Sequence, residues 1–291
     1  MKTLKTLWLP LFFICSSALF GQDDDGGSVI QTLTPSKLIA QGQFDIKFFN
    51  NLYTETRQTF NGVESDIPRQ TFFTSTIEAY TGVSATRRVN LGLILEMRSN
   101  VVADRPALDV FKFDGERNSA RSGITSIAPS VKFVPFEKIS NVSIQSSLFI
   151  PLVDNESEDG VFLDQKGFTW QNRVFYDYTF PGNDWQLFSE INSELNFGEM
   201  EESFANNSLR LTPGVFLSYF PSSKFTILAL AQHSQLLDLG NEFSQEFTAL
   251  GGGAKYQLTD ALNLEALYTK FIRGTDTGLG QTFNLGLRAV F

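Results

Sequence analysis

Apolar and polar residues alternate with a period of two in most of twelve strand-length segments of this chain. In the first segment, Phe44, Ile46 and Phe48 fall on one side, while Asp45 and Lys47 fall on the other. A helix cannot separate these sets, whereas a strand must, because successive side chains point to opposite faces. The segments are Leu38–Phe48, Gln70–Val83, Arg88–Val102, Ile124–Pro135, Asn141–Leu152, Phe168–Phe180, Trp185–Phe197, Ser208–Phe220, Phe225–Gln235, Phe243–Tyr256, Ala261–Ile272 and Gln281–Phe291.

The length of these segments suits a membrane. About ten residues let a tilted strand cross a bilayer, so the pattern predicts an all-β fold, a transmembrane up-and-down antiparallel β-barrel of twelve strands. Leu93 and Ile191 are expected to face lipid. The parity stays open for the fourth, ninth and tenth segments, where the alternation is weak.

Long and short connections alternate between the segments. The short ones are centred on Ala85-Thr86, Glu137-Lys138, Gly182-Asn183-Asp184, Ser222-Ser223 and Leu258-Thr259. Barrels of this class have short periplasmic turns and longer extracellular loops, so both termini should be periplasmic. Residues 49–69 are then expected to form a long first extracellular loop.

Aromatic residues gather near the short turns, with the parity that we interpret as outward. This placement is typical of an aromatic girdle at a membrane interface. The residues are Tyr178, Trp185, Tyr219, Phe225, Tyr256 and Phe291.

The amino terminus has the layout of a secretory signal peptide. Lys2 and Lys5 precede an apolar run from Leu7 to Leu19, and Gly21 offers a small residue for cleavage. Ile14 before Cys15 disfavours lipidation, which requires a small residue there. We therefore predict a signal peptide over residues 1–21, a polar periplasmic leader over 22–36 and the barrel over 37–291.

Charge and composition exclude several classes. Removing Lys2 and Lys5 takes away two positive charges, so the formal net charge of −9 becomes −11, which argues against nucleic acid as a partner. A chain that is 42% hydrophobic with 29 Phe residues is not disordered. No stretch after the signal peptide approaches 18 apolar residues, so a closed barrel is the remaining way to span lipid.

The carboxy terminus carries a specific resemblance. Alternate apolar residues run up to a terminal aromatic residue, and the pattern resembles the assembly signal of outer-membrane proteins; its residues are Phe283, Leu285, Leu287, Ala289 and Phe291. The Gly21-Gln22 junction and the Phe-rich composition are similar to those of Bacteroidota outer-membrane proteins. The resemblance implies a Gram-negative cell outer membrane, with outer-membrane lipid and the assembly machinery as partners.

Charged residues of both signs fall on the predicted inner face. One hypothesis is a narrow, porin-like pore for passive transport of a small hydrophilic solute, with these residues lining it. The other is an ion-pair network inside a non-conducting accessory subunit that binds another outer-membrane protein. The candidates are Asp45, Lys47, Glu78, Glu96, Arg98, Arg173, Asp177, Glu190, Glu194, Arg210, Lys255, Glu265 and Arg288.

An enzyme is disfavoured. The single histidine, His233, precedes Ser234, and adjacent strand residues point to opposite faces. The acidic residues in the third and fourth loops do not match a calcium-binding pattern, so we expect a solvated rim and no metal or cofactor; they are Asp154, Glu156, Glu158, Asp159, Asp164, Glu199, Glu201 and Glu202.

Three further features leave alternatives open. The loop Ala103–Gly123 could constrict the mouth, pack against a partner or cover itself. Gly251-Gly252-Gly253 is expected to permit a strand bend or bulge. Inner aromatic residues either fill space or form a sliding surface for a solute; these are Tyr80, Phe149, Phe175, Phe188 and Phe216.

Overall fold

The computed structural model describes residues 36–198, 205–240 and 242–291. The signal peptide and nearly all of the leader expected from the sequence lie outside these residues. Glu199, Glu201 and Glu202 lie outside them as well. In the described ranges, no helix is long and apolar enough to cross a membrane.

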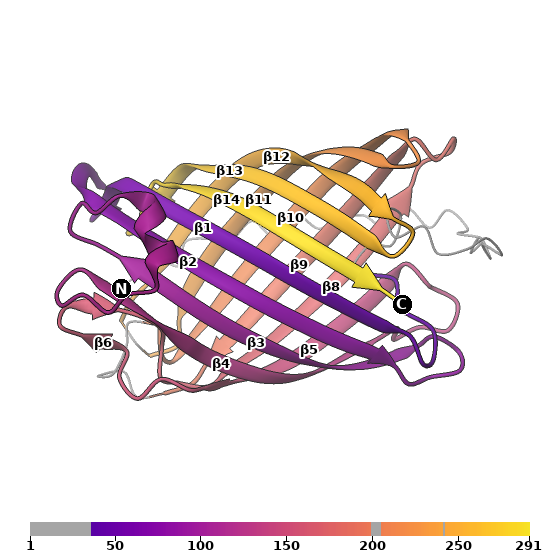
Figure 1. Ribbon diagram of the computed structural model, residues 1–291, viewed down its shortest axis with the longest axis horizontal. Coiled ribbons are helices and arrows are strands. Elements are labelled where there is room, and N and C mark those ends of the chain that lie inside the picture. Colours follow the sequence, from indigo (N-terminus) through magenta and orange to yellow (C-terminus); the bar gives the residue numbers. More distant parts are fainter. Residues whose placement is uncertain (1–35, 199–204, 241) are drawn as a thin grey trace, which may run out of the picture.

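Twelve antiparallel strands close into a barrel, which confirms the predicted fold (Figure 1). β1 pairs with β14 from Asp45↔Val290 to Thr54↔Gln281, so the described barrel has no free strand edge. The barrel strands are β1 (Phe44–Phe60), β2 (Val63–Gly82), β3 (Val89–Val101), β4 (Ala120–Phe133), β5 (Val142–Pro151), β8 (Thr169–Thr179), β9 (Trp185–Asn196), β10 (Ser208–Ser222), β11 (Phe225–Asp238), β12 (Gln245–Thr259), β13 (Leu262–Thr275) and β14 (Gln281–Val290).

Strand pairing fixes which side chains face lipid, because residues directly opposite each other share a face of the sheet. Phe48 pairs with Ile77 and with Leu287, and all three are exposed on the outer wall. Leu93 and Ile191 lie on the same wall and are 48% and 54% exposed, as the alternation predicts. The wall toward lipid is therefore apolar.

The first connection differs from the prediction. β1 continues to Phe60 and β2 begins at Val63, so the expected long loop over residues 49–69 is wrong. Asn61 and Gly62 have φ angles of 51° and 76°, which suit the two-residue turn that joins hairpin strands. The periplasmic end of β1 also differs from the prediction, because β1 starts at Phe44 and not at Leu38.

Irregular pairing explains the weak alternation of β4. Its register against β3 shifts between Glu96 and Met97, and Thr125 is the extra residue. A bulge of this kind reverses the parity along the strand. In β12, by contrast, the register runs unbroken through Gly251-Gly252-Gly253 and shifts at Thr248/Ala249. A bulge at the glycines, one of the two expected alternatives, is therefore wrong; Gly251 and Gly253 allow close approach to β13, and Gly252 allows close approach to β11.

The connection between β3 and β4 folds over the outer wall. Its 3₁₀ helix η2 (Ala107–Lys112) buries Val110 against Phe73, Val101 and Ala120, all on the outward face. Phe111 packs edge-on against Phe73, with ring centroids 5.0 Å apart. This loop therefore does not constrict the mouth (Figure 1).

Arg105 holds that connection together. Its guanidinium contacts the carboxylates of Asp109, Asp114 and Glu116 at 3.0, 2.9 and 3.1 Å. The hydrogen bond from Arg105 lowers the pKa of Asp114. Hydrogen bonds from Lys112 and Arg105 lower the pKa of Asp109. The folded loop thus favours both carboxylates in their charged form.

Candidate functional site

The charged residues predicted to line a pore all lie on the inner wall. Strand pairing places Lys47 opposite Glu78 and opposite Arg288, so these three side chains share one face. The pairing of the remaining strands places the other predicted residues on the same inner face. Twelve of the thirteen predicted residues form ion pairs with one another or with Asp164, and Asp177 accepts a hydrogen bond from Ser36. The structure places the set on one inner surface, as one chain of four residues and several separate ion pairs.

One chain of ion pairs crosses the lumen. Lys47 contacts Glu78 at 3.3 Å, Glu78 contacts Arg173 at 3.7 Å, and Arg173 contacts Glu190 at 2.7 Å. β2 and β8, which carry Glu78 and Arg173, are separated in the ring by β3, β4 and β5. Opposite charges ~4 Å apart attract by ~4 kcal/mol at an effective dielectric near 20. This contact therefore narrows the lumen and ties its walls together.

Lys132 is a lumen residue that sequence reasoning missed. It lies on β4, is 2% exposed, and its ammonium stands 4.9 Å and 5.6 Å from the ring centroids of Tyr80 and Phe175. The Tyr80 hydroxyl lies 2.8 Å from the Ser130 hydroxyl. The bulge at Thr125 obscured the parity that would have placed Lys132 inside.

The segment Ser36–Gln43, here called the strap, crosses the periplasmic mouth. Ser36 donates a hydrogen bond to Asp177 of β8, while Ile39 packs against Val290 of β14, on the opposite side of the ring. Gly42 donates its backbone N–H to the carbonyl of Gly82 at 3.0 Å. Ile39 is buried, so this end of the lumen is covered by the chain's own amino-terminal residues.

The connection between β5 and β8 covers the extracellular mouth. It contains the short hairpin of β6 (Ser157–Glu158) and β7 (Val161–Phe162). Its Asp164 pairs with the inward-facing Arg98 at 2.9 Å. Asn100, also inward-facing, donates to the carbonyls of Phe162 and Leu163 at 2.8 and 3.1 Å. This loop, and not the one after β3, folds into the mouth.

Asp154, Glu158 and Asp159 of that loop are exposed, as expected for a solvated rim, whereas Asp164 departs from the expectation. Asp159 contacts Arg117 at 3.2 Å, and Glu158 contacts Arg121 at 3.6 Å. Asp164 is 6% exposed, because Arg98 holds it inside the mouth. In the part of the chain that the structure describes, no acidic, histidine or cysteine residues are grouped so as to hold a metal ion.

Cavities remain in the described barrel between its covered ends. The central one has a volume of about 400 Å³, and its lining includes Thr76, Glu190, Lys255 and Phe188. A smaller one of about 100 Å³ lies toward the extracellular loop, beside Arg98 and Asp164. Both are lined by ion-paired side chains and are suited to hold small polar molecules.

The inner aromatic residues divide into two roles. Phe175 is fully buried and fills space next to the cavity, where its ring stacks on that of Phe188 with centroids 5.9 Å apart. Phe149, Phe188 and Phe216 line the cavity, and the rings of Phe188 and Phe216 are 5.4 Å apart. The central cavity therefore combines charged groups with an apolar strip.

The histidine lies away from this site. His233 faces outward on β11, and its Nδ1 lies 3.0 Å from the Thr248 hydroxyl. Ser234 points inward and accepts a hydrogen bond from Thr212. The two side chains are on opposite faces of the wall, so they do not form a nucleophile and base.

Comparison with known proteins identifies the fold. No family model matches the chain, and no curated protein sequence matches it. The COG4313 outer membrane channel from Pseudomonas putida F1 is similar in structure, with a TM-score of 0.69 and 12% identity over 88% of this chain and 98% of that one. The β domain of the Bordetella autotransporter Brka has a TM-score of 0.57 and 15% identity over 85% and 99%. The fold and the apolar outer wall define a bacterial outer-membrane β-barrel, located in the cell outer membrane.

Proposed function

We propose that the barrel is a narrow channel for passive passage of a small hydrophilic solute, and that it is not an enzyme. The observation that carries the proposal is the central cavity, enclosed by charged residues from both halves of the ring. Pores of this kind select solutes by rings of charged side chains at a constriction. The similar structure from Pseudomonas is described as a channel, which supports the same function.

Conduction requires the strap to leave the periplasmic mouth. The strap is held by the buried side chains of Leu38 and Ile39, by the hydrogen bond from Ser36 to Asp177, and by backbone hydrogen bonds that join Gly42 and Gln43 to Gly82. Burying each of these two apolar side chains contributes about 1.5–3 kcal/mol, so the covered state is stable, yet opening it breaks only the contacts of one short segment. The strap therefore acts as a gate in this proposal.

A second candidate is a non-conducting accessory subunit that binds another outer-membrane protein. The contact between Glu78 and Arg173 favours it, because this contact joins β2 to β8 across the three strands that separate them in the ring. A scaffold has no need of an open path, and a cross-linked interior would make its wall rigid.

Planar-bilayer recording separates the two. Wild-type protein should show small, infrequent channel events, and Ile39→Asp should raise their conductance or frequency, because a carboxylate is costly to bury in the apolar contact with Val290. Ile139→Asp is the matched control, since Ile139 lies in the turn between β4 and β5 and is exposed. Silence from wild type and from Ile39→Asp alike would favour the accessory subunit.

We also propose that the outward residues of β14, together with Phe291 directly after it, serve as the assembly signal. Phe283, Leu285 and Phe291 are exposed on the outer wall, where the assembly machinery could contact them. Phe291 stacks on Phe44 with ring centroids 6.1 Å apart. Phe291→Ala should slow insertion into the outer membrane, measured by heat-modifiable migration of newly made protein, while Phe44→Ala should do so less.

A further inference from the structure

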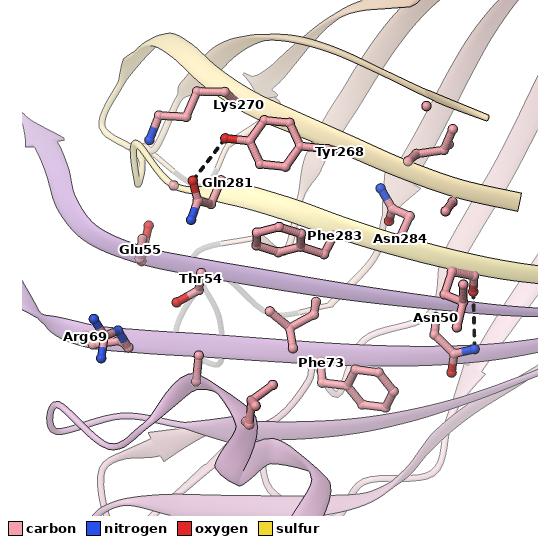
Figure 2. Close-up of a pocket in the computed structure, with 18 of the residues that line it drawn as sticks. Asn50, Thr54, Glu55, Arg69, Phe73, Tyr268, Lys270, Gln281, Phe283 and Asn284 are labelled. Carbon is pink, nitrogen blue, oxygen red and sulfur yellow. Dashed lines mark hydrogen bonds between the residues drawn. The ribbon is translucent and has the colours of Figure 1, made fainter. Parts of the chain in front are cut away.

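A deep groove runs along the outer wall beside η2 (Figure 2). Its volume is about 1140 Å³, and apolar side chains dominate it. Strand pairing aligns Leu52 with Phe73 and with Phe283, so these side chains share the face directed at lipid. The main apolar residues are Leu52, Phe73, Leu108, Phe111, Phe283 and Leu285.

Small residues make the groove deep. Gly252 and Ala266 lie on the same outward face, opposite Tyr268 and Leu285 in the strand pairing. An added Cβ at Gly252 would stand 2.8 Å from the carbonyl oxygen of Leu228, so a larger residue there is excluded. η2 forms the facing wall through Leu108 and Phe111. An extended hydrocarbon chain fits such a groove, which has bulky side chains along both sides and small residues along its base.

Basic side chains stand at the extracellular end of the groove. Arg57, Arg69 and Lys270 line it, against one carboxylate, Glu55, which accepts a hydrogen bond from Tyr53 at 2.6 Å. Arg57 pairs with Glu64, whereas the Arg69 guanidinium has no acidic partner within the described ranges. An excess of positive charge at the extracellular end of a lipid-facing groove suits an anionic headgroup.

We propose that this groove binds one anionic lipid of the outer leaflet, with an acyl chain along Leu52, Phe283 and Leu285 and a headgroup phosphate on Arg69. The position of the groove on the lipid-facing wall selects a membrane lipid as the occupant. The apolar part of the groove matches an acyl chain, and its basic end matches an anionic headgroup. Figure 2 shows Arg69 and Lys270 at the same end of the groove.

Native mass spectrometry of the full barrel, released from detergent with added phosphatidylglycerol or phosphatidylcholine, tests the proposal. Wild type should retain one phosphatidylglycerol in preference to phosphatidylcholine by about fivefold, the effect of about 1 kcal/mol for one basic residue near an anionic headgroup. Arg69→Gln should abolish the preference. Arg87→Gln, in the turn between β2 and β3, should leave it unchanged.

A second variant tests the apolar part. Ala266→Phe should lower retention of both lipids, because its ring would fill the groove, and heat-modifiable migration verifies that the barrel is folded. Equal retention of the two lipids by wild type, or a preference that survives Arg69→Gln, would overturn the proposal. A dimer in place of bound lipid would show that a second copy of the chain covers the groove. Channel recordings do not depend on any of these outcomes.

Discussion

Two extracellular connections of similar length fold to opposite sides of the same wall. The one between β3 and β4 places Val110 and Phe111 on the outer face, against Phe73. The one between β5 and β8 places Asp164 inside the mouth, against Arg98. The outer wall is apolar and the inner wall is charged, so each loop packs on the wall that its own side chains match.

The wall on which each loop packs is set by the few residues that the loop buries. Val110 stabilises the outer loop because its apolar side chain leaves water to pack against Phe73. The Asp164 carboxylate stabilises the inner loop because it pairs with the inward-facing guanidinium of Arg98. Both loops contain charged and apolar residues, so composition alone is ambiguous. The deciding residues are the few that become buried, Val110 in one loop and Leu163 and Asp164 in the other.

The largest expected effect comes from Val110→Asp. Val110 is fully buried, so the variant loses its apolar burial and would have to bury a carboxylate, a cost of at least about 3 kcal/mol. The outer loop should detach, and trypsin should cut the assembled barrel after Lys112, which is followed by Phe113. Val63→Asp, at an exposed position beside the Asn61-Gly62 turn, should leave the loop resistant. Equal resistance of both variants would contradict the packing described.

A smaller effect is expected from Asp164→Ala. It leaves Arg98 without its closest carboxylate, a loss of about 1–3 kcal/mol. The inner loop should become sensitive to trypsin at Lys166, while the outer loop should stay resistant. Asp159→Ala is the control, because its ion pair with Arg117 is exposed and contributes under about 1 kcal/mol. Matching cleavage in the two variants would mean that Asp164 does not anchor the loop.

Much of the barrel could be predicted from sequence because alternation follows directly from strand geometry. The strand count and the inward position of residues such as Arg173 and Glu190 came from that pattern alone. The first hairpin was missed, although Asn61-Gly62 is a turn signal visible in the sequence. The strap was missed because Ala40 to Phe48 alternates as a strand does, and only the position of Ile39 inside the mouth shows otherwise.

The rest depends on contacts between distant residues. Asp164 and Arg98 pair across 66 positions of sequence, and Glu78 and Arg173 meet only because the barrel closes. Lys132 was hidden by the bulge at Thr125, which reverses parity within β4. Such features follow from the three-dimensional arrangement of the ring and carry no local pattern.

The smallest expected effect is a pH dependence of the outer loop, the connection between β3 and β4. The pKa values of Asp109 and Asp114 are lowered in the folded outer loop, so their contribution is present above about pH 4, their ordinary value, and is lost as pH falls through the lowered values. Fluorescence of a Phe111→Trp variant should stay constant from neutral pH to about pH 4 and change below it. A transition centred near neutral pH would contradict this account of the Arg105 cluster.

Chemical modification inside the cavity tests the channel most directly. Thr76 lines the central cavity, while its neighbour Ile77 faces lipid. A charged, water-soluble thiol reagent should reduce single-channel conductance of Thr76→Cys and leave that of Ile77→Cys unchanged. Conductance that is unaffected in Thr76→Cys after verified labelling would show that ions do not pass through this lumen.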